Sequence, residues 1–199
     1  QGLAKLGVQF KIENGFVIGK VLKKLTGNKI KLSYPSVGAT ENILMAAVMA
    51  EGQTAIHNAA KEPEIEDLGK CLISMGAKID GLGTNKILIQ GVNKLDKASH
   101  SIIPDRIVAG TFIILGVMLN EKIQINNINS QHLISLIKIL KKMGANLNVS
   151  KNSVIINPTK HLKSTSVVTE PYPGFPTDLQ AQLMSLMSIV HGRSQIKEM

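Results

Sequence analysis

The chain has 199 residues, a formal net charge of +9 and 44% hydrophobic residues, so it is long enough to bury a sizeable core in one or two domains. No apolar run approaches the ~20 residues that a membrane-spanning helix needs. The longest such run is only 112-FIILGVML-119. The single cysteine, Cys71, excludes an internal disulfide framework and is typical of proteins in a reducing cytoplasm.

The positive charge favours an anionic partner, such as a phosphate ester, a sugar nucleotide or a nucleic acid. The basic residues are scattered, however, and they cluster only at 20-KVLKK-24 and 138-KILKK-142. Nucleic-acid-binding proteins typically combine a basic patch with aromatic side chains, and aromatic residues make up only 3% of this chain. We therefore expect no nucleic-acid partner and no membrane partner.

The first residues predict the end of a helix followed by a β-hairpin. The segment 2-GLAKLGVQF-10 is typical of a helix that ends at a glycine, Gly7, and leads into a strand. The strand 9-QFKI-12 then turns at Asn14-Gly15 into 16-FVIG-19. Asn-Gly is a strong signal for a two-residue hairpin turn with positive φ at both residues.

Two different helices follow. The segment 40-TENILMAAVMAEGQTAIHNA-59 predicts a helix that starts near Thr40, then a polar turn and a strand. This helix is apolar around most of its circumference, which indicates burial on several sides. The segment 68-LGKCLISMGAKI-79 predicts an amphipathic helix with Cys71 as a small core residue, and 78-KIDGLGTNKILIQG-91 predicts a hairpin.

This series of elements repeats along the chain. The apolar helix returns in 111-TFIILGVMLNEKIQINNI-128, and the amphipathic helix in 136-LIKILKKMGANL-147, with a hairpin at 146-NLNVSKNSVIIN-157. The Met-Gly-Ala triplets that begin at Met75 and Met143 stand 68 residues apart. The segment 183-LMSLMSIVHGRSQIKEM-199 begins another copy. The pattern predicts an α/β fold of repeated βαβαββ units, with two nearly complete copies and a piece at each end.

Two polar segments precede apolar helices and are candidate binding or catalytic sites. In 172-YPGFPTDLQAQLMSLM-187, Asp178 is either an N-cap of the helix or a carboxylate held rigidly for chemistry. In 35-PSVG-38, Ser36 either caps an ordinary turn or belongs to a phosphate-binding helix N-terminus. The residues alone leave both alternatives open for Asp178, whereas for Ser36 they favour the ordinary capped turn. The five histidines show no metal-ligand spacing, so we expect no metal site.

Four segments resemble the family of UDP-N-acetylglucosamine 1-carboxyvinyltransferases, with matching order and spacing over essentially the whole chain. They are 35-PSVGATENILMAA-47, 58-NAAKEPEIEDLGKCLISMGAKI-79, 104-PDRIVAGTF-112 and 173-PGFPTDLQAQ-182. The resemblance implies two domains, each an inside-out α/β barrel of three βαβαββ units, with substrates bound between them. It implies that residues 1–104 form the C-terminal part of the first domain and residues 105–199 the N-terminal part of the second.

The resemblance also implies an activity. Members of this family act in the bacterial cytoplasm, without a cofactor, and open peptidoglycan synthesis. They move the enolpyruvyl group of phosphoenolpyruvate onto the 3-hydroxyl of UDP-N-acetylglucosamine and release phosphate. By this resemblance Asp178 is the general base for the 3-hydroxyl, and Pro35, Ser36, Val37 and Gly38 form the nucleotide-diphosphate loop. Tyr34 stands where some relatives carry a substrate-binding lysine, so we include its ring in the substrate-binding set.

Other family features do not fall on catalytic positions of this chain. Asp105 and Arg106 match a loop of the next repeat, where we expect a structural role. The family's reactive cysteine, which lies in a Gly-rich loop, and most of its phosphate-binding arginines match no residue here. We therefore expect the chain to be part of a longer polypeptide, to need the remaining segments of that polypeptide, and to be inactive alone. The alternative is a non-catalytic remnant that binds a UDP-sugar or a partner.

Overall fold

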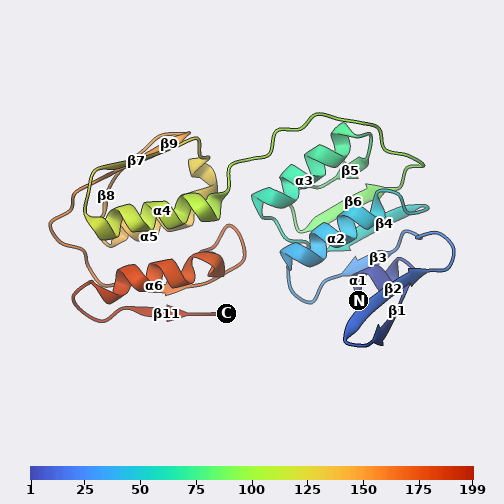
Figure 1. The fold of residues 1–199 in the computed structure, drawn as a ribbon, viewed down its shortest axis with the longest axis horizontal. Helices are drawn as coiled ribbons and strands as arrows, with labels where there is room; N and C mark the ends of the chain where they lie inside the picture. The colour runs from blue at the N-terminus through green and yellow to red at the C-terminus, as the bar shows by residue number, and fades with distance from the viewer. The chain divides into compact units, whose positions relative to one another are not determined.

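The computed structural model describes residues 1–199, which form two compact units, Gln1–Ile102 and Ile103–Met199. Each unit has its own hydrophobic core, which is almost entirely aliphatic, and the two cores share no residue. Figure 1 shows each unit as a layer of helices against strands. The fold is α/β, as predicted, but its strands form four separate sheets and no closed barrel.

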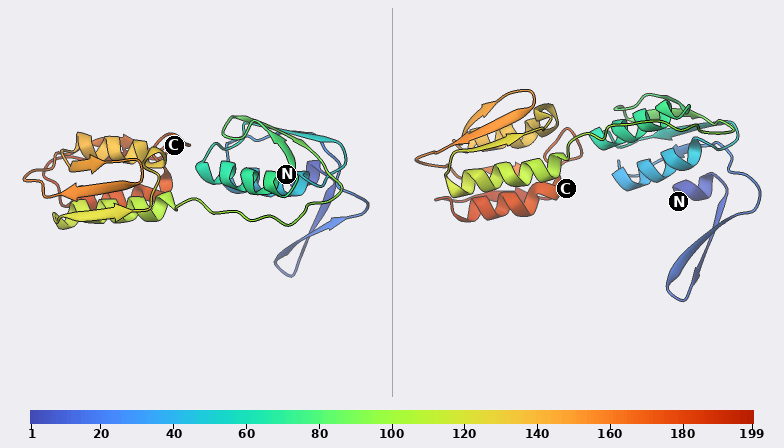
Figure 2. Two further views of the ribbon diagram at one scale, coloured as in Figure 1. Left: turned by 90° about the horizontal axis from the view of Figure 1, so that it is seen from above. Right: turned by 45° about the horizontal axis from the view of Figure 1, so that its top comes forward.

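The first unit begins with the predicted helix end and hairpin. Helix α1 (Gly2–Lys5) leads into β1 (Val8–Glu13), which pairs antiparallel with β2 (Phe16–Val21). Asn14 and Gly15 connect the strands with φ of 51° and 80°, so the Asn-Gly turn is confirmed. The hairpin projects from the rest of the unit (Figure 2) and exposes large apolar side chains, among them Ile12 and Phe16.

The rest of the first unit is one complete βαβαββ repeat. Its four strands form a sheet in the order β3-β4-β6-β5, in which β3 and β4 are parallel and the other neighbours are antiparallel. The amphipathic helix α3 begins at Pro63, which suits the first helical position, and has Glu64 and Glu66 in its first turn. The elements are β3 (Lys29–Lys31), α2 (Val37–Ala47), β4 (Gln53–His57), α3 (Pro63–Ser74), β5 (Lys78–Asp80) and β6 (Lys86–Gln90).

The second unit contains a repeat without its first strand, which corrects the prediction of two nearly complete copies. Its sheet has only three strands, in the order β7-β9-β8, because residues 98–105 form no strand ahead of α4. Strands β10 and β11 form a further parallel pair, and α6 lies between them in the sequence. This order repeats the β3-α2-β4 arrangement of the first unit. The elements are α4 (Arg106–Leu119), β7 (Ile123–Asn126), η1 (Ser130–Leu133), α5 (Ile134–Lys142), β8 (Asn146–Val149), β9 (Ser153–Asn157), β10 (Ser166–Val168), η2 (Thr177–Leu179), α6 (Gln180–Ser188) and β11 (Gln195–Lys197).

The glycine after each amphipathic helix confirms the repeat at the level of the backbone. Gly7, Gly76 and Gly144 follow α1, α3 and α5 with φ of 101°, 101° and 98°. L-residues with a side chain rarely adopt such angles, so glycine is the favoured residue at this stop signal. In each case the chain turns directly into the strand that the sequence predicts.

The apolar helices are less buried than their composition indicates. Helix α4 packs Ile113, Ile114 and Val117 into the core, but Val108, Phe112, Leu115 and Leu119 line up along its other side and are exposed. In the same way α2 exposes Met45, and Met49 is exposed in the turn that follows the helix. The prediction of burial on several sides therefore holds for one face only. Helices α4 and α6 lie side by side (Figures 1 and 2) and belong to the same core.

Two further sequence predictions need correction. The apolar helix α2 begins at Val37, not near Thr40, because Ser36 caps it. Cys71 is a free thiol in α3, as predicted, but it is half-buried and is not part of the hydrophobic core. The core face of α3 is formed instead by Ile65 and Leu72.

Candidate functional site

The predicted site residues lie at equivalent corners of the repeats. Ser36 follows β3 and begins α2, whereas Asp178 follows β10 and lies just ahead of α6. In both cases the loop leaves the carboxyl end of a strand that is paired in parallel with its neighbour. This end of a parallel strand pair is where open α/β sheets place ligands. The same corner of the intervening repeat carries Asp105.

The first corner is a capped helix N-terminus. Ser36 Oγ accepts a hydrogen bond from Ala39 N at 3.3 Å, and Thr40 Oγ1 donates to Ser36 O at 2.8 Å. Thr40 Oγ1 in turn accepts from Ala60 N at 3.1 Å, which ties the turn to the segment after β4. The predicted serine cap is therefore confirmed. The amides of Val37 and Gly38 belong to the first turn, whose N–H groups have no carbonyl partner within the helix.

Small pockets flank this turn on two sides. One, of about 280 Å³, has Tyr34 and Ser36 in its lining together with Lys5 and Lys31. The other, of about 330 Å³, is bounded by Gly38, Ala39 and Asn42. Tyr34 is 55% exposed, and Pro35 is half-buried. The turn thus offers free space and cationic side chains next to helix amides, an arrangement that suits an anionic group.

A partly buried acid lies on the next turn of the same helix. Burial raises the pKa of Glu41 above its ordinary value, and the nearby carboxylate of Glu64 raises it further. A raised pKa favours the neutral carboxylic acid.

The second corner holds Asp178 between two buried anchors. Phe175 and Leu179 are 3% and 1% exposed and belong to the core of the second unit. The loop before them is closed by hydrogen bonds from Glu170 N to Phe175 O and from Gly174 N to Pro171 O, both 2.9 Å long. The Tyr172–Pro173 peptide bond is cis. The backbone is thus anchored before Asp178 by this loop and by Phe175, and after Asp178 by Leu179.

The Asp178 carboxylate itself is exposed and makes no side-chain hydrogen bond or ion pair in this structure. The residue lies inside η2, and the residues at the N-caps of η2 and α6 are Pro176 and Leu179, neither with a side-chain cap. The N-cap alternative for Asp178 is therefore wrong. Asp178 therefore combines a backbone held by its neighbours with a carboxylate that no contact in the fold engages.

The neighbours of Asp178 bond among themselves. Thr177 Oγ1 lies 3.2 Å from Gln180 Oε1 and 2.9 Å from Glu198 Oε1. Gln182 Nε2 donates to Thr111 Oγ1 at 3.0 Å and so links α6 to α4. Gly110 lets the Leu179 side chain approach α4, since a Cβ at that glycine would lie 2.7 Å from Leu179 Cδ1. These contacts fix η2 against α4.

Asp105 has the structural role that the sequence predicts. Its Oδ1 accepts hydrogen bonds from Ile107 N at 2.8 Å and Val108 N at 3.0 Å, which is a helix N-cap. Arg106 is buried, and its guanidinium carbon lies 5.8 Å from the centre of the Tyr172 ring. The local sequence pattern gives no sign of this cation–π contact, because the two residues are far apart in the chain.

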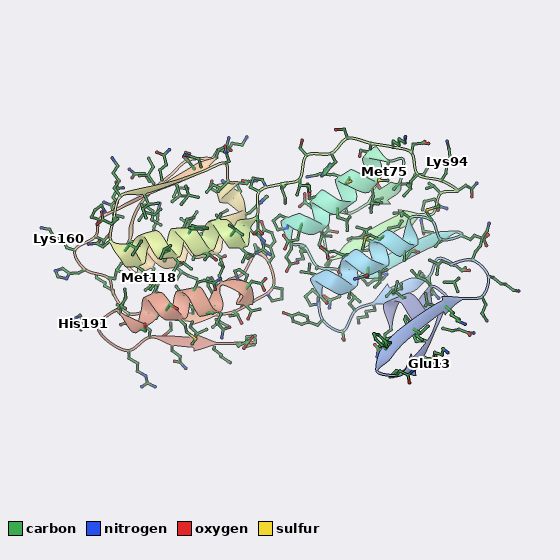
Figure 3. All side chains as sticks on the ribbon, viewed as in Figure 1. Glu13, Met75, Lys94, Met118, Lys160 and His191 are labelled. Atoms are coloured by element: carbon green, nitrogen blue, oxygen red, sulfur yellow. The ribbon has the colours of Figure 1, made fainter.

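Other candidates for sites are sparse. No group of three His, Cys, Asp or Glu side chains is placed to hold a metal ion. A pocket of about 210 Å³ in the second unit contains no predicted site residue. Lys160, His191 and Met118 gather at that end of the unit (Figure 3), and the full lining is Val117, Met118, Asn120, Thr159, Lys160, His161, Leu162, Ile189, Val190 and His191. None of the helices is both long and apolar enough to cross a bilayer.

Comparison with known proteins identifies the family. The family model described as EPSP synthase (3-phosphoshikimate 1-carboxyvinyltransferase) matches residues 1–199. The chain belongs to the EPSP synthase family. Within it, the chain is 44% identical over 198 residues to a UDP-N-acetylglucosamine 1-carboxyvinyltransferase of Granulibacter bethesdensis and 48% identical over 198 residues to UDP-N-acetylglucosamine 1-carboxyvinyltransferase 2 of Clostridium tetani. The resemblance inferred from the sequence motifs is thus confirmed.

Both alignments cover 100% of this chain but only 47% of each relative, so the chain spans about half the length of the curated family members that it matches. Solved structures confirm the EPSP synthase family fold. The enolpyruvyl transferase NikO from Streptomyces tendae matches 99% of this chain and 50% of its own length, with a TM-score of 0.87 at 23% identity. An EPSP synthase from Acinetobacter baumannii matches 98% of this chain and 46% of its own, with a TM-score of 0.66 at 22% identity.

Proposed function

We propose that the polypeptide carrying this chain transfers the enolpyruvyl group of phosphoenolpyruvate to the 3-hydroxyl of UDP-N-acetylglucosamine and releases phosphate. The names of the relatives at 44% and 48% identity support this choice of acceptor. The relatives are bacterial, and we place the reaction in the bacterial cytoplasm, as the first committed step of peptidoglycan synthesis. Residues 1–104 then belong to the first domain of the transferase and residues 105–199 to the second.

The observation that carries the proposal is the free carboxylate of Asp178 on a backbone fixed by Phe175 and Leu179. In the proposed reaction C3 of phosphoenolpyruvate gains a proton, and C2 becomes electrophilic. The sugar hydroxyl attacks C2 while Asp178 takes its proton, which gives a tetrahedral ketal. Loss of phosphate and of a proton from C3 then restores the double bond. A base that acts in this way must be held within hydrogen-bond reach of the hydroxyl.

The turn from Tyr34 to Gly38 binds the diphosphate of the sugar nucleotide in this proposal. Its support is the helix N-terminus capped by Ser36, the open space above Gly38 and the lysines in the adjacent pocket. Backbone N–H groups at a helix N-terminus bind phosphate oxygens well because the helix dipole adds to the hydrogen bonds. Tyr34, which is exposed beside the turn, would pack against the bound nucleotide.

The Gly38→Ala variant tests this loop without touching its charges. Nothing lies within 4 Å of a Cβ added at Gly38, so the change should alter the free energy of unfolding by less than about 1 kcal/mol, in the stabilising direction. The same methyl group would hold a diphosphate away from the turn and weaken UDP-N-acetylglucosamine binding by roughly tenfold, about 1.4 kcal/mol. Isothermal titration and urea unfolding measure the two quantities.

Met45→Ala is the matched control, since Met45 is exposed two turns further along α2. It should leave binding unchanged. Equal binding by the wild type and Gly38→Ala would remove the turn from the site, whatever the activity of the protein.

The chain alone should show no turnover. It contains no residue assigned as the proton donor to C3, and loss of preorganised charges around the reacting groups removes most rate acceleration in such reactions. We expect no phosphate release above background from phosphoenolpyruvate and UDP-N-acetylglucosamine when only residues 1–199 are present. Phosphate release that depends on both substrates would contradict this expectation.

A second candidate function is a non-catalytic UDP-sugar-binding protein. The Ser36 turn and its pockets favour it, because they need no other segment to bind an anion weakly. Titration of the sugar nucleotide into the polypeptide with its flanking segments separates the two candidates. Binding together with turnover supports the transferase, whereas binding without any turnover supports the alternative.

A further inference from the structure

The segment that joins the two units, residues 91–105, has no helix or strand but is attached to the first unit along most of its length. Gly91 N donates to Gly52 O at 2.9 Å, and Val92 N donates to Val48 O at 2.8 Å. Further on, Asp96 N donates to Met75 O at 2.8 Å. Met75 ends α3, and Figure 3 labels it together with Lys94 of the joining segment. Leu95 packs against the core of the first unit.

The last attachment is made by side chains. His100 Nε2 lies 2.9 Å from Asp67 Oδ1 on α3. The two side chains are only 20% and 13% exposed, so water screens this contact much less than the surface ion pair between Lys94 and Asp96, whose partners are 79% and 70% exposed. A hydrogen bond to an ionised carboxylate in such a position is among the stronger ones in proteins.

Asp105, the last residue of the joining segment, is the first whose hydrogen bonds belong to the second unit. Its carboxylate caps α4 through the amides of Ile107 and Val108, so its backbone is part of the helix start. Between His100 and Asp105 no backbone or side-chain hydrogen bond is formed, and Ile102 is 83% exposed. The stretch between these two attachments is residues 101–104, Ser-Ile-Ile-Pro.

We propose that the His100–Asp67 contact clamps the joining segment to the first unit and confines the flexible joint between the units to residues 101–104. Without the clamp the last attachment to the first unit is Asp96 N, and the joint lengthens to residues 97–104. The proline at position 104 further narrows the joint, because its φ is fixed near −65°. The His100–Asp67 contact thus shortens the flexible segment between the two units, and this effect does not depend on which ligand the protein binds.

Backbone ¹⁵N relaxation of the whole 199-residue chain tests the clamp. In the wild type we expect order parameters near about 0.85 up to His100 and below about 0.6 for residues 101–103. In Asp67→Ala and in His100→Ala, each of which removes one partner of the hydrogen bond, the order parameters of residues 97–100 should fall below about 0.6, while those of α3 stay high. The double variant should resemble either single variant, since both remove one contact.

Asp96→Asn is the matched control, because it removes the exposed ion pair with Lys94 but keeps the Asp96 N–H bond to Met75. It should leave residues 97–100 ordered. Low order parameters at residues 97–100 in the wild type, or unchanged values in both clamp variants, would overturn the proposal. Because two variants are used on opposite sides of the contact, a folding defect in one of them does not leave the question open.

Discussion

Replacing Asp178 by asparagine is expected to lower kcat by roughly 10²- to 10⁴-fold in the polypeptide that carries this chain with its flanking segments. The amide keeps the size and the hydrogen-bonding reach of the carboxylate but cannot take the proton of the sugar hydroxyl. Because the carboxylate makes no contact that holds the fold, the free energy of unfolding should change by less than about 0.5 kcal/mol. Steady-state kinetics and urea unfolding provide the two measurements.

Glu170→Gln is the control for this prediction. Glu170 is an exposed acid in the same loop, and its backbone amide bonds to Phe175 O whatever the side chain. We expect its kcat to match the wild type within about twofold, a difference well below the 1.36 kcal/mol that corresponds to tenfold. If Asp178→Asn keeps full turnover, the role of general base must pass to another residue.

Replacing Ile113 by alanine is expected to destabilise the second unit by about 2–5 kcal/mol and to leave the first unit unchanged. Ile113 is fully buried in α4 and belongs to one core, whereas Ile56 in β4 is fully buried in the other. Since the two cores share no residue, Ile56→Ala should have the converse effect. Hydrogen exchange followed by mass spectrometry resolves the opening of each unit separately.

An isoleucine outside both cores provides the reference. Ile102 is 83% exposed, and Ile102→Ala should change the stability of either unit by less than about 0.5 kcal/mol. If Ile113→Ala loosens both units equally, the chain unfolds as one cooperative body, and the division at residues 102 and 103 does not describe its energetics.

The repeat was predictable because its signals are local. The glycine after each amphipathic helix, the Asn14-Gly15 turn and the alternation of apolar and amphipathic helices are read from neighbouring residues. These signals also gave the approximate boundaries of the helices and strands, with errors of a few residues such as the start of α2. The missing first strand of the second repeat was not predictable, because a strand forms only where a neighbouring strand offers hydrogen bonds.

The sequence pointed to Ser36 and Asp178 as candidates but could not tell whether either side chain caps a helix. Local preference gave Ser36 and Asp178 the same two alternatives, cap or functional group. The structure assigns the cap to Ser36 and denies it to Asp178, because η2 places that carboxylate past the capping position and outside the loop's hydrogen bonds. Asp105, at the same corner of the intervening repeat, does cap its helix.

The sequence by itself determined the α/β repeat, the family and the segments that form the candidate site, because each is encoded in short runs of residues with fixed spacing. Only the tertiary structure decided which of these side chains make hydrogen bonds within the fold and which do not. It also revealed the contacts of Arg106 with Tyr172 and of His100 with Asp67, since pairs separated by 66 and 33 positions are brought together by packing and leave no periodic signal in the sequence.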